Sequence, residues 1–221
     1  MKKSTTNISA KSSSYDDARR SALKRAGAIA SALALPASIL SSPVMASSEN
    51  ADSDQTTPEL EQYGIRGYRA PEIQLDYWID ANGNETEFSV KAQEGKWLFI
   101  KFWQAWCPGC HKLGFPTLKK FADEFKDHPE VVAVGVQTVF EGESFNTKDK
   151  VREMQLKYEL PITMGHDIGT ELTEHHPLSM INYRTGGTPW LILVAPDGTV
   201  VQNHFHIDAE LLIEFVHQYV A

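Results

Sequence analysis

The chain lacks a long hydrophobic run. Its most apolar stretch near the N-terminus, AGAIASALALPASIL, covers the 15 residues from Ala26 to Leu40, whereas a membrane span needs about 20. A retained membrane anchor is therefore not expected. Cysteine is also scarce, since the chain has two and both lie in KFWQAWCPGC at residues 101–110. The absence of cysteine near position 46, where a leader would be cleaved, excludes a lipoprotein anchor.

Basic residues are few in most of the chain. There are 21 Lys and Arg against 29 Asp and Glu, and the first 46 residues hold seven of the 21 beside two Asp. From Ser47 onward the formal net charge is therefore −13. Nucleic acids and anionic membrane surfaces bind clustered Lys and Arg, so neither is an expected partner.

The first 46 residues have the composition of a leader. A polar basic segment ending in ARRSALKR precedes the apolar stretch, and PVMA follows with small residues at Val44 and Ala46. This order predicts a signal peptide over 1–46 that is cleaved near Ala46. Arg19 and Arg20, followed by Leu-Lys two residues later, resemble a twin-arginine export signal, and the alternative is a general-secretion signal. Either route predicts an exported protein, in the periplasm or beyond.

The residues after the predicted leader form a second distinct segment. Residues 47–64, SSENADSDQTTPELEQYG, are acidic and polar and lack apolar periodicity. Such composition predicts a flexible linker. The folded domain is therefore expected over 65–221.

That domain alternates between two kinds of pattern. Strands separated by helices predict an α/β domain with a central parallel or mixed sheet that is covered on both faces. The APDG at 195–198 predicts a hairpin and an antiparallel edge, and Asp208 is expected to cap a C-terminal helix. The strand-like runs are EIQLDYWI, KWLFIKFW, VVAVGVQT, PITMGHD, TPWLILVA and TVVQNHFH, and the helical ones are HKLGFPTLKKFADEF, TKDKVREMQLKYE and DAELLIEFVHQYV.

The two cysteines fall where a strand meets a helix. KWLFIKFW predicts a buried strand, and the helical pattern begins at Cys107, with Pro108 at the first helical position, where its missing N–H has no partner to lose. A cysteine at a helix N-terminus is stabilised as a thiolate by free N–H groups and the helix dipole. Cys110 follows one turn later, close enough for a disulfide. The pattern predicts a pair that cycles between dithiol and disulfide.

The cysteine motif and its surroundings resemble a known family. Trp106-Cys107-Pro108-Gly109-Cys110 after Phe102-Trp103, with Gly187-Thr188-Pro189 entering a later strand, resembles the thioredoxin fold. The upstream GYRAPEIQLDYWIDANGNETEF, together with LKYELPITMGHD and APDGTVV, is similar to the TlpA/ResA-like exported thiol-disulfide oxidoreductases of the redoxin group. The resemblance implies a central mixed sheet flanked by helices, with an N-terminal β-hairpin extension.

The resemblance also implies a substrate groove around the cysteines. In the family the proline before the fourth main strand is cis and faces the cysteine pair, and the residue before it pairs with a bound peptide. Pro189 and Thr188 take these places here, and Trp106, Pro108 and Gly109 complete the expected groove. Trp106 is either an aromatic cover or a packing residue, whereas Trp97, Trp103 and Trp190 are expected in the core.

The sequence departs from the family in two places near the cysteines. HKLGF places one residue more between Cys110 and Pro116 than is usual, and the acidic residue that some relatives carry there is absent. Lys101 stands where thioredoxins hold a buried carboxylate, and it either tunes the thiols from below or extends its amine to solvent or an acidic partner. His111, next to Cys110, is a second candidate for tuning the thiolate.

Two other functions compete with disulfide exchange. Cys107 and Cys110 with a histidine would suit copper or zinc, but thioredoxin-fold copper chaperones place three residues between their cysteines. The candidate histidines are His166, His175, His176, His204 and His206. Peroxide-reducing relatives hold Thr or Ser three residues before the reactive cysteine, where this chain has Gln104.

A purely structural disulfide is the remaining alternative. A bridge across so short a loop adds little stability, because the entropy that it removes grows with loop length. The sequence therefore predicts an exported thiol-disulfide oxidoreductase that needs no cofactor. Its expected partners are protein thiols and disulfides and a membrane or soluble redox protein.

Overall fold

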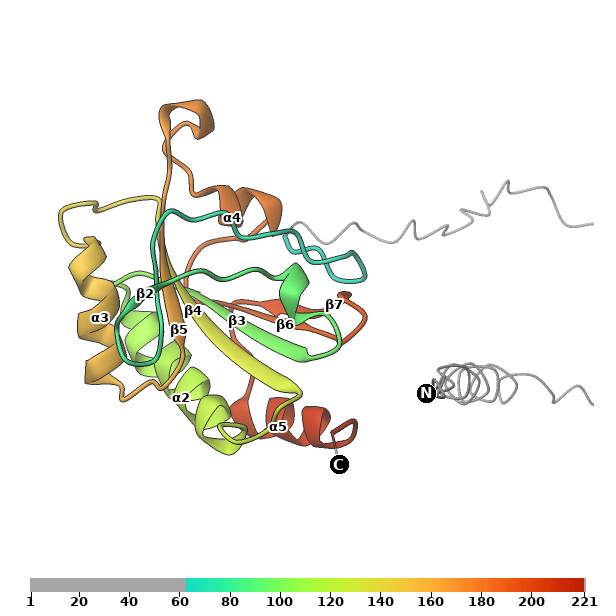
Figure 1. The fold of residues 1–221 in the computed structure, drawn as a ribbon. Helices are drawn as coiled ribbons and strands as arrows, with labels where there is room; N and C mark the ends of the chain where they lie inside the picture. Colours follow the sequence, from blue (N-terminus) through green and yellow to red (C-terminus); the bar gives the residue numbers. More distant parts are fainter. Residues whose placement is uncertain (1–62, 221) are drawn as a thin grey trace, which may run out of the picture. The chain divides into compact units, whose positions relative to one another are not determined.

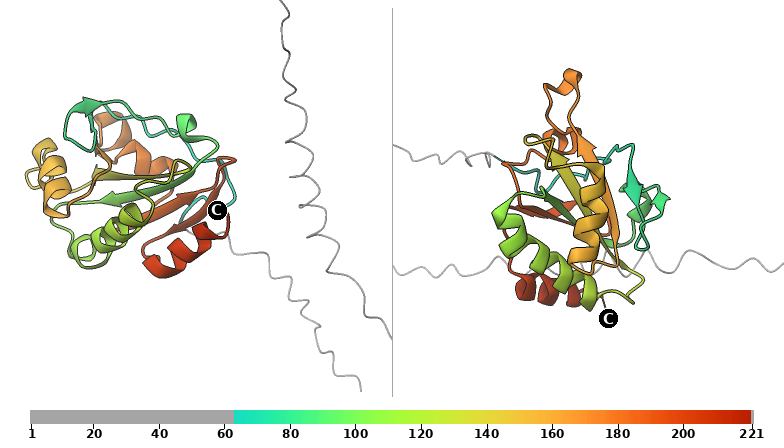
Figure 2. Two further views of the ribbon diagram at one scale, coloured as in Figure 1. Left: turned by 60° about the horizontal axis from the view of Figure 1, so that its bottom comes forward. Right: turned by 90° about the vertical axis from the view of Figure 1, so that its left-hand side faces the viewer.

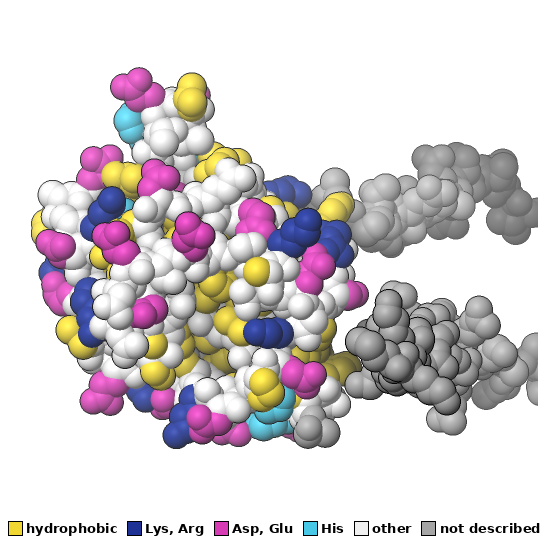
Figure 3. Space-filling model, viewed as in Figure 1, with side chains coloured by type: hydrophobic (Ala, Val, Ile, Leu, Met, Phe, Trp, Pro, Cys, Tyr) yellow, Lys and Arg dark blue, Asp and Glu magenta, His cyan; other side chains and the backbone are white. Residues whose placement is uncertain are grey.

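The computed structural model describes residues 63–220 (Figure 1). The predicted signal peptide, 1–46, and nearly all of the predicted linker, 47–64, lie outside the described residues. Within the described part of the chain, no helix is long and apolar enough to cross a membrane. Lys and Arg side chains on the face shown in Figure 3 lie scattered among Asp and Glu.

A seven-stranded mixed sheet forms the centre of the domain, in the order β2-β1-β5-β4-β3-β6-β7. β3 pairs in parallel with β4 and antiparallel with β6, while β4 and β5 are parallel. The strands are β1 (Trp78–Ile79), β2 (Glu85–Thr86), β3 (Trp97–Trp103), β4 (Val131–Val139), β5 (Thr163–Ile168), β6 (Trp190–Val194) and β7 (Val200–His204). The prediction of a mixed sheet is confirmed.

Helices cover both faces of this sheet (Figures 1 and 2). The longer helices are α2 (Phe115–Glu124), α3 (Lys148–Lys157) and α5 (Ala209–His217), and the short ones are the π-helix η2 (Cys110–Gly114), α4 (Leu178–Asn182) and the 3-10 turns η1 (Lys91–Gln93) and η3 (Glu171–Thr173). Asp208 accepts a hydrogen bond from the Leu211 amide at 3.1 Å, which confirms the predicted cap of α5.

Alternation along β3 divides the core into two layers. Trp97, Phe99 and Trp103 pack with residues of α2, α3 and α5 on one face. Leu98 and Phe102 pack on the other face with residues from and next to α4. Because every residue of β3 is buried, this strand is covered from both sides.

Hairpins close both ends of the sheet. β6 and β7 are antiparallel and joined by the predicted turn, in which the Gly198 amide donates to the Ala195 carbonyl at 2.8 Å. Gly198 has a φ of 82°, which glycine adopts without strain. At the other end β1 and β2 form the expected N-terminal hairpin, and the Asp80 carboxylate accepts from the Asn82 and Asn84 amides.

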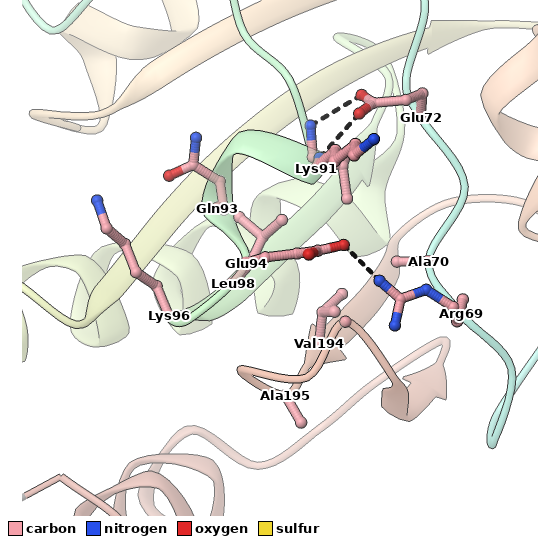
Figure 4. Close-up of a pocket in the computed structure, with 12 residues that line it drawn as sticks. Arg69, Ala70, Glu72, Lys91, Gln93, Glu94, Lys96, Leu98, Val194 and Ala195 are labelled. Atoms are coloured by element: carbon pink, nitrogen blue, oxygen red, sulfur yellow. Dashed lines mark hydrogen bonds and ion pairs between the residues drawn. The ribbon is translucent and has the colours of Figure 1, made fainter. Parts of the chain in front are cut away.

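The strand in the EIQLDYWI segment is shorter than its pattern predicts. Only Trp78 and Ile79 pair, while Glu72 turns to the start of η1 and accepts hydrogen bonds from the Val90 and Lys91 amides at 2.9 and 2.8 Å. Figure 4 shows this carboxylate at a pocket of about 340 Å³. The nearby Arg69 pairs with Glu94, so both carboxylates at this pocket hold neighbouring loops together.

Candidate active site

The cysteine pair lies at the C-terminal end of the central strand β3. After Trp103 the chain turns through residues 104–106, and Pro108 is the first helical residue, as predicted. The Cys110 amide donates to Cys107 Sγ at 3.2 Å, and the Thr188 carbonyl oxygen lies 3.4 Å from Cys107 Sγ. Both cysteines are free thiols; Cys107 is 5% exposed and Cys110 is fully buried.

The environment separates the two thiols chemically. A hydrogen bond from the Cys110 thiol, with smaller help from backbone N–H and the Lys101 charge, lowers the pKa of Cys107 from 9.0 to about 5 against the opposing effect of burial. Burial, and then the same hydrogen bond, raises the pKa of Cys110. Near neutral pH the arrangement therefore holds one thiolate, Cys107, and one thiol, Cys110.

The loop before β6 faces the cysteines. The Thr188–Pro189 peptide bond is cis. A Cβ on Gly109 would lie 3.0 Å from Pro189 Cδ, so glycine allows the first helical turn to approach this proline closely. Pro108, Gly109, Thr188 and Pro189 thus lie around Cys107, where the sequence expectation placed them.

Trp106 differs from the other tryptophans of this region. It is 44% exposed, whereas Trp97, Trp103 and Trp190 are buried as predicted. A Cβ on Gly142 would lie 3.3 Å from Trp106 Nε1, so the indole ring lies against the loop that follows β4. Trp106 therefore offers an accessible aromatic surface next to Cys107.

Lys101 is fully buried in the layer between β3 and α2. Among the described residues its Nζ has no hydrogen-bond partner, and it lies 5.4 Å from the centre of the Phe115 ring. The interpretation in which this amine reaches solvent or an acidic partner is therefore wrong. Burial lowers the pKa of Lys101 to about 8, while a thiolate at Cys110 or Cys107 acts in the opposite direction.

The segment after Cys110, where the sequence predicts an extra residue, forms a π-helical turn. Residues Cys110–Gly114 form η2, and a π turn accommodates one residue more than an α-helical turn. The turn places Gly114 against the lysine, because a Cβ on Gly114 would lie 1.9 Å from Lys101 Nζ and 3.0 Å from Pro189 Cβ. No side chain larger than hydrogen fits there without moving the amine.

His111 uses both ring nitrogens in hydrogen bonds away from the cysteines. Its Nε2 donates to the Ala105 carbonyl at 2.6 Å, because a carbonyl only accepts. Its Nδ1 lies 2.6 Å from the Tyr158 hydroxyl. The ring therefore ties the turn before Cys107 to the end of α3.

Asn146 is a second support of this turn, and no pattern in the sequence indicates it. Its Oδ1 accepts from the Ala105 amide at 2.7 Å, and its Nδ2 donates to the Glu141 and Gly142 carbonyls, each at 3.1 Å. The residue lies 41 positions after Ala105 in a polar loop, so no local pattern marks it. The same holds for Tyr158, which lies 47 positions after its partner His111.

The histidines proposed as metal ligands do not gather at the cysteines. His166 Nδ1 donates to Gln137 Oε1 at 2.7 Å, and burial lowers the pKa of His166 to about 4. His175 and His176 follow η3, while His204 and His206 lie at the end of β7. Across residues 63–220, no group of three His, Cys, Asp or Glu is placed to hold a metal ion.

Comparison with solved structures confirms the thioredoxin-like fold. The thioredoxin-like superfamily protein SPOA0173 is 28% identical, with a TM-score of 0.60 over 69% of this chain and 95% of that one. A thiol-disulfide isomerase from Corynebacterium glutamicum is 26% identical, with a TM-score of 0.58 over 69% of this chain and 97% of that one.

Sequence comparison gives the family. The thiol-disulfide oxidoreductase ResA of Bacillus subtilis (strain 168) is 30% identical over 137 residues, which are 62% of this chain and 65% of the relative. The chain thus spans less than two thirds of the length of the curated ResA relatives that it matches. The AhpC/TSA family model matches residues 66–203, more than half of the sequence, and the chain therefore belongs to the AhpC/TSA family.

Proposed function

We propose that the protein is an exported thiol-disulfide oxidoreductase that works through Cys107 and Cys110. The observation that carries this proposal is the contrast between the two thiols. Cys107 lies at a helix N-terminus with a pKa of about 5, and Cys110 is buried behind it with a raised pKa. A nucleophilic thiolate beside a protonated resolving thiol suits attack on a disulfide.

The reaction takes two exchange steps. The Cys107 thiolate attacks one sulfur of a client disulfide, which forms a mixed disulfide and releases the other client sulfur as a thiolate. Cys110 then loses its proton and attacks Cys107 Sγ, which closes the Cys107–Cys110 disulfide and releases the second client sulfur. Two electrons pass from the pair to the client, and the reverse sequence oxidises a client dithiol. No step uses a cofactor.

The residues around Cys107 suit an extended peptide as client. The Thr188 carbonyl lies 3.4 Å from Cys107 Sγ, and the backbone there would pair with a peptide that carries the reacting sulfur. Trp106, 44% exposed, supplies an aromatic contact beside it. The partners we infer are protein thiols and disulfides, with a membrane or soluble redox protein to regenerate the pair.

Peroxide reduction is less well supported. Gln104 stands three residues before Cys107, is fully buried, and donates from Nε2 to the Glu141 carbonyl at 3.2 Å. It offers no hydroxyl group toward the thiolate.

Export rests on the sequence of residues 1–46, with its basic start, its apolar stretch and Ala46 before the expected cleavage point. The direction of transfer depends on the potential of the pair, which spans about −270 to −120 mV across proteins of this fold. A thiolate with a pKa near 5 favours a value between these ends.

Reduction of insulin by dithiothreitol tests the activity. The purified domain should accelerate it, while Cys107→Ser should remove the acceleration in a protein that still folds. Equilibration with glutathione buffers gives the potential, and N-terminal sequencing of the exported protein gives the cleavage site. An intact domain that leaves the insulin rate unchanged would rule out the proposed activity.

A further inference from the structure

The Lys101 amine lies in the protein interior, where no carboxylate or hydrogen-bond acceptor is paired with it among the described residues. The residue is fully buried, and within residues 63–220 its Nζ makes no hydrogen bond. The space for the amine exists because Gly114, the last residue of η2, has no side chain. A buried ammonium without a counter-charge is costly, so its protonation depends on the charges that face it.

Two groups act electrostatically on Lys101, Cys110 and Cys107, and of these Cys107 is the one that carries a charge near neutral pH. His111 and Tyr158, the next titratable groups on the neighbouring elements, bond to one another. The residues that β4, β6 and α2 place against Lys101 carry no charge; they are Gly135, Leu191 and Phe115.

The charge of the pair changes when it is oxidised. In the reduced form the Cys107 thiolate favours the Lys101 ammonium, which opposes the effect of burial. A disulfide carries no charge, so oxidation removes the negative charge that raises the pKa of Lys101. Burial, which lowers this pKa, then acts alone. The ammonium is then disfavoured, and a lysine in such a place loses its proton.

We propose that Lys101 is a redox-linked proton carrier, which holds a proton while the cysteine pair is reduced and releases it when the pair becomes a disulfide. This rests on the proposed function. Cys107 thiolate, Cys110 thiol and Lys101 ammonium give the disulfide, a neutral amine, two protons and two electrons. A client disulfide takes up both electrons and both protons and leaves as two thiols. Without the lysine, the pair at neutral pH releases one proton, from Cys110.

The proton count can be measured through the equilibrium with glutathione. Reduction of oxidised glutathione consumes two electrons and two protons, so a pair that releases two protons has an equilibrium constant that does not change with pH. We expect this for the wild-type protein between pH 6 and 7.5. Lys101→Met replaces the lysine with a side chain of similar volume and no charge. In this variant the equilibrium constant for oxidation of the pair by oxidised glutathione should fall tenfold for each unit by which the pH rises. A tenfold change is equivalent to 29.6 mV for a two-electron couple.

Two further variants sharpen the test. Gly114→Ala keeps the lysine but fills the space of its amine, so its constant should also fall with pH. Lys120→Met removes an exposed lysine that pairs with Glu210, and its constant should stay flat. A tenfold slope in the wild type, or a flat line in Lys101→Met, would overturn the inference while insulin reduction still supports disulfide exchange. If the wild-type protein does not reduce insulin, that result would count against the proposed function instead.

Discussion

The stability of the reduced protein should rise between pH 5 and pH 7, and Cys107 should be one source of this rise. Its pKa is about 5 in the folded state and 9.0 without the fold. Between these values the folded protein binds fewer protons than the unfolded chain, so the free energy of unfolding increases with pH. The contribution is complete above the unfolded value and is lost as the pH falls through about 5.

The size of the effect follows from the two pKa values. Each pH unit between them adds about 1.4 kcal/mol. Since Cys107 is half titrated at pH 5, the gain from pH 5 to pH 7 is about 2 kcal/mol. The pKa of His166 is lowered to about 4, and its titration also raises stability with pH in part of this range. The experiment must therefore compare two proteins that share this histidine.

Urea denaturation of reduced Lys101→Met and of the reduced double variant Lys101→Met/Cys107→Ser at pH 5, 6 and 7 provides that comparison, because the protonation of Lys101 itself depends on the charge of Cys107. His166 and the carboxylates contribute equally to both proteins, so the difference between their free energies of unfolding isolates Cys107. We expect the protein that keeps Cys107 to gain about 2 kcal/mol over the variant that lacks it across this range. A difference that stays constant, or that shrinks as the pH rises, would refute the assignment of a depressed pKa to Cys107.

Three further substitutions have defined outcomes. Asn146→Ala leaves the Ala105 amide without its partner, so urea denaturation should show a loss of about 2 kcal/mol, and an unchanged midpoint would contradict the role of Asn146. Gly109→Ala brings a Cβ within 3.0 Å of Pro189 Cδ, and we expect a loss of about 1 kcal/mol with slower insulin reduction. Trp106→Ala should raise the KM for insulin but leave reaction with a small aromatic disulfide unchanged, and equal effects on both substrates would exclude a docking role.

Much of the fold could be predicted because its signals are local. The alternation in KWLFIKFW set the two faces of β3, APDG marked the hairpin, and Asp208 marked the start of α5. The short helix α4 was missed because five residues, LSMIN, are too few to show a helical period. EIQLDYWI has a strand pattern, yet contacts with η1 take most of it out of the sheet.

The candidate site also contains residues that local sequence patterns indicate and residues that only the structure shows. The cysteine motif and Thr188-Pro189 are visible in the sequence because spacing and residue type identify them. Asn146 supports the site through contacts between segments distant in the chain, which no local pattern shows. Lys101 and the longer segment before Pro116 are visible in the sequence as differences from the family. Only the structure shows that Gly114 makes room for the Lys101 amine.

Trapping of a mixed disulfide tests the central claim most directly. Cys110→Ser removes the resolving thiol, so a protein that attacks disulfides through Cys107 should stay linked to its substrate after one exchange. We expect Cys110→Ser, incubated with an excess of insulin, to form a covalent adduct that mass spectrometry assigns to Cys107 and that dithiothreitol releases. Cys107→Ser should form none under the same conditions. Adducts that form through Cys110 in Cys107→Ser, but not through Cys107 in Cys110→Ser, would contradict the account.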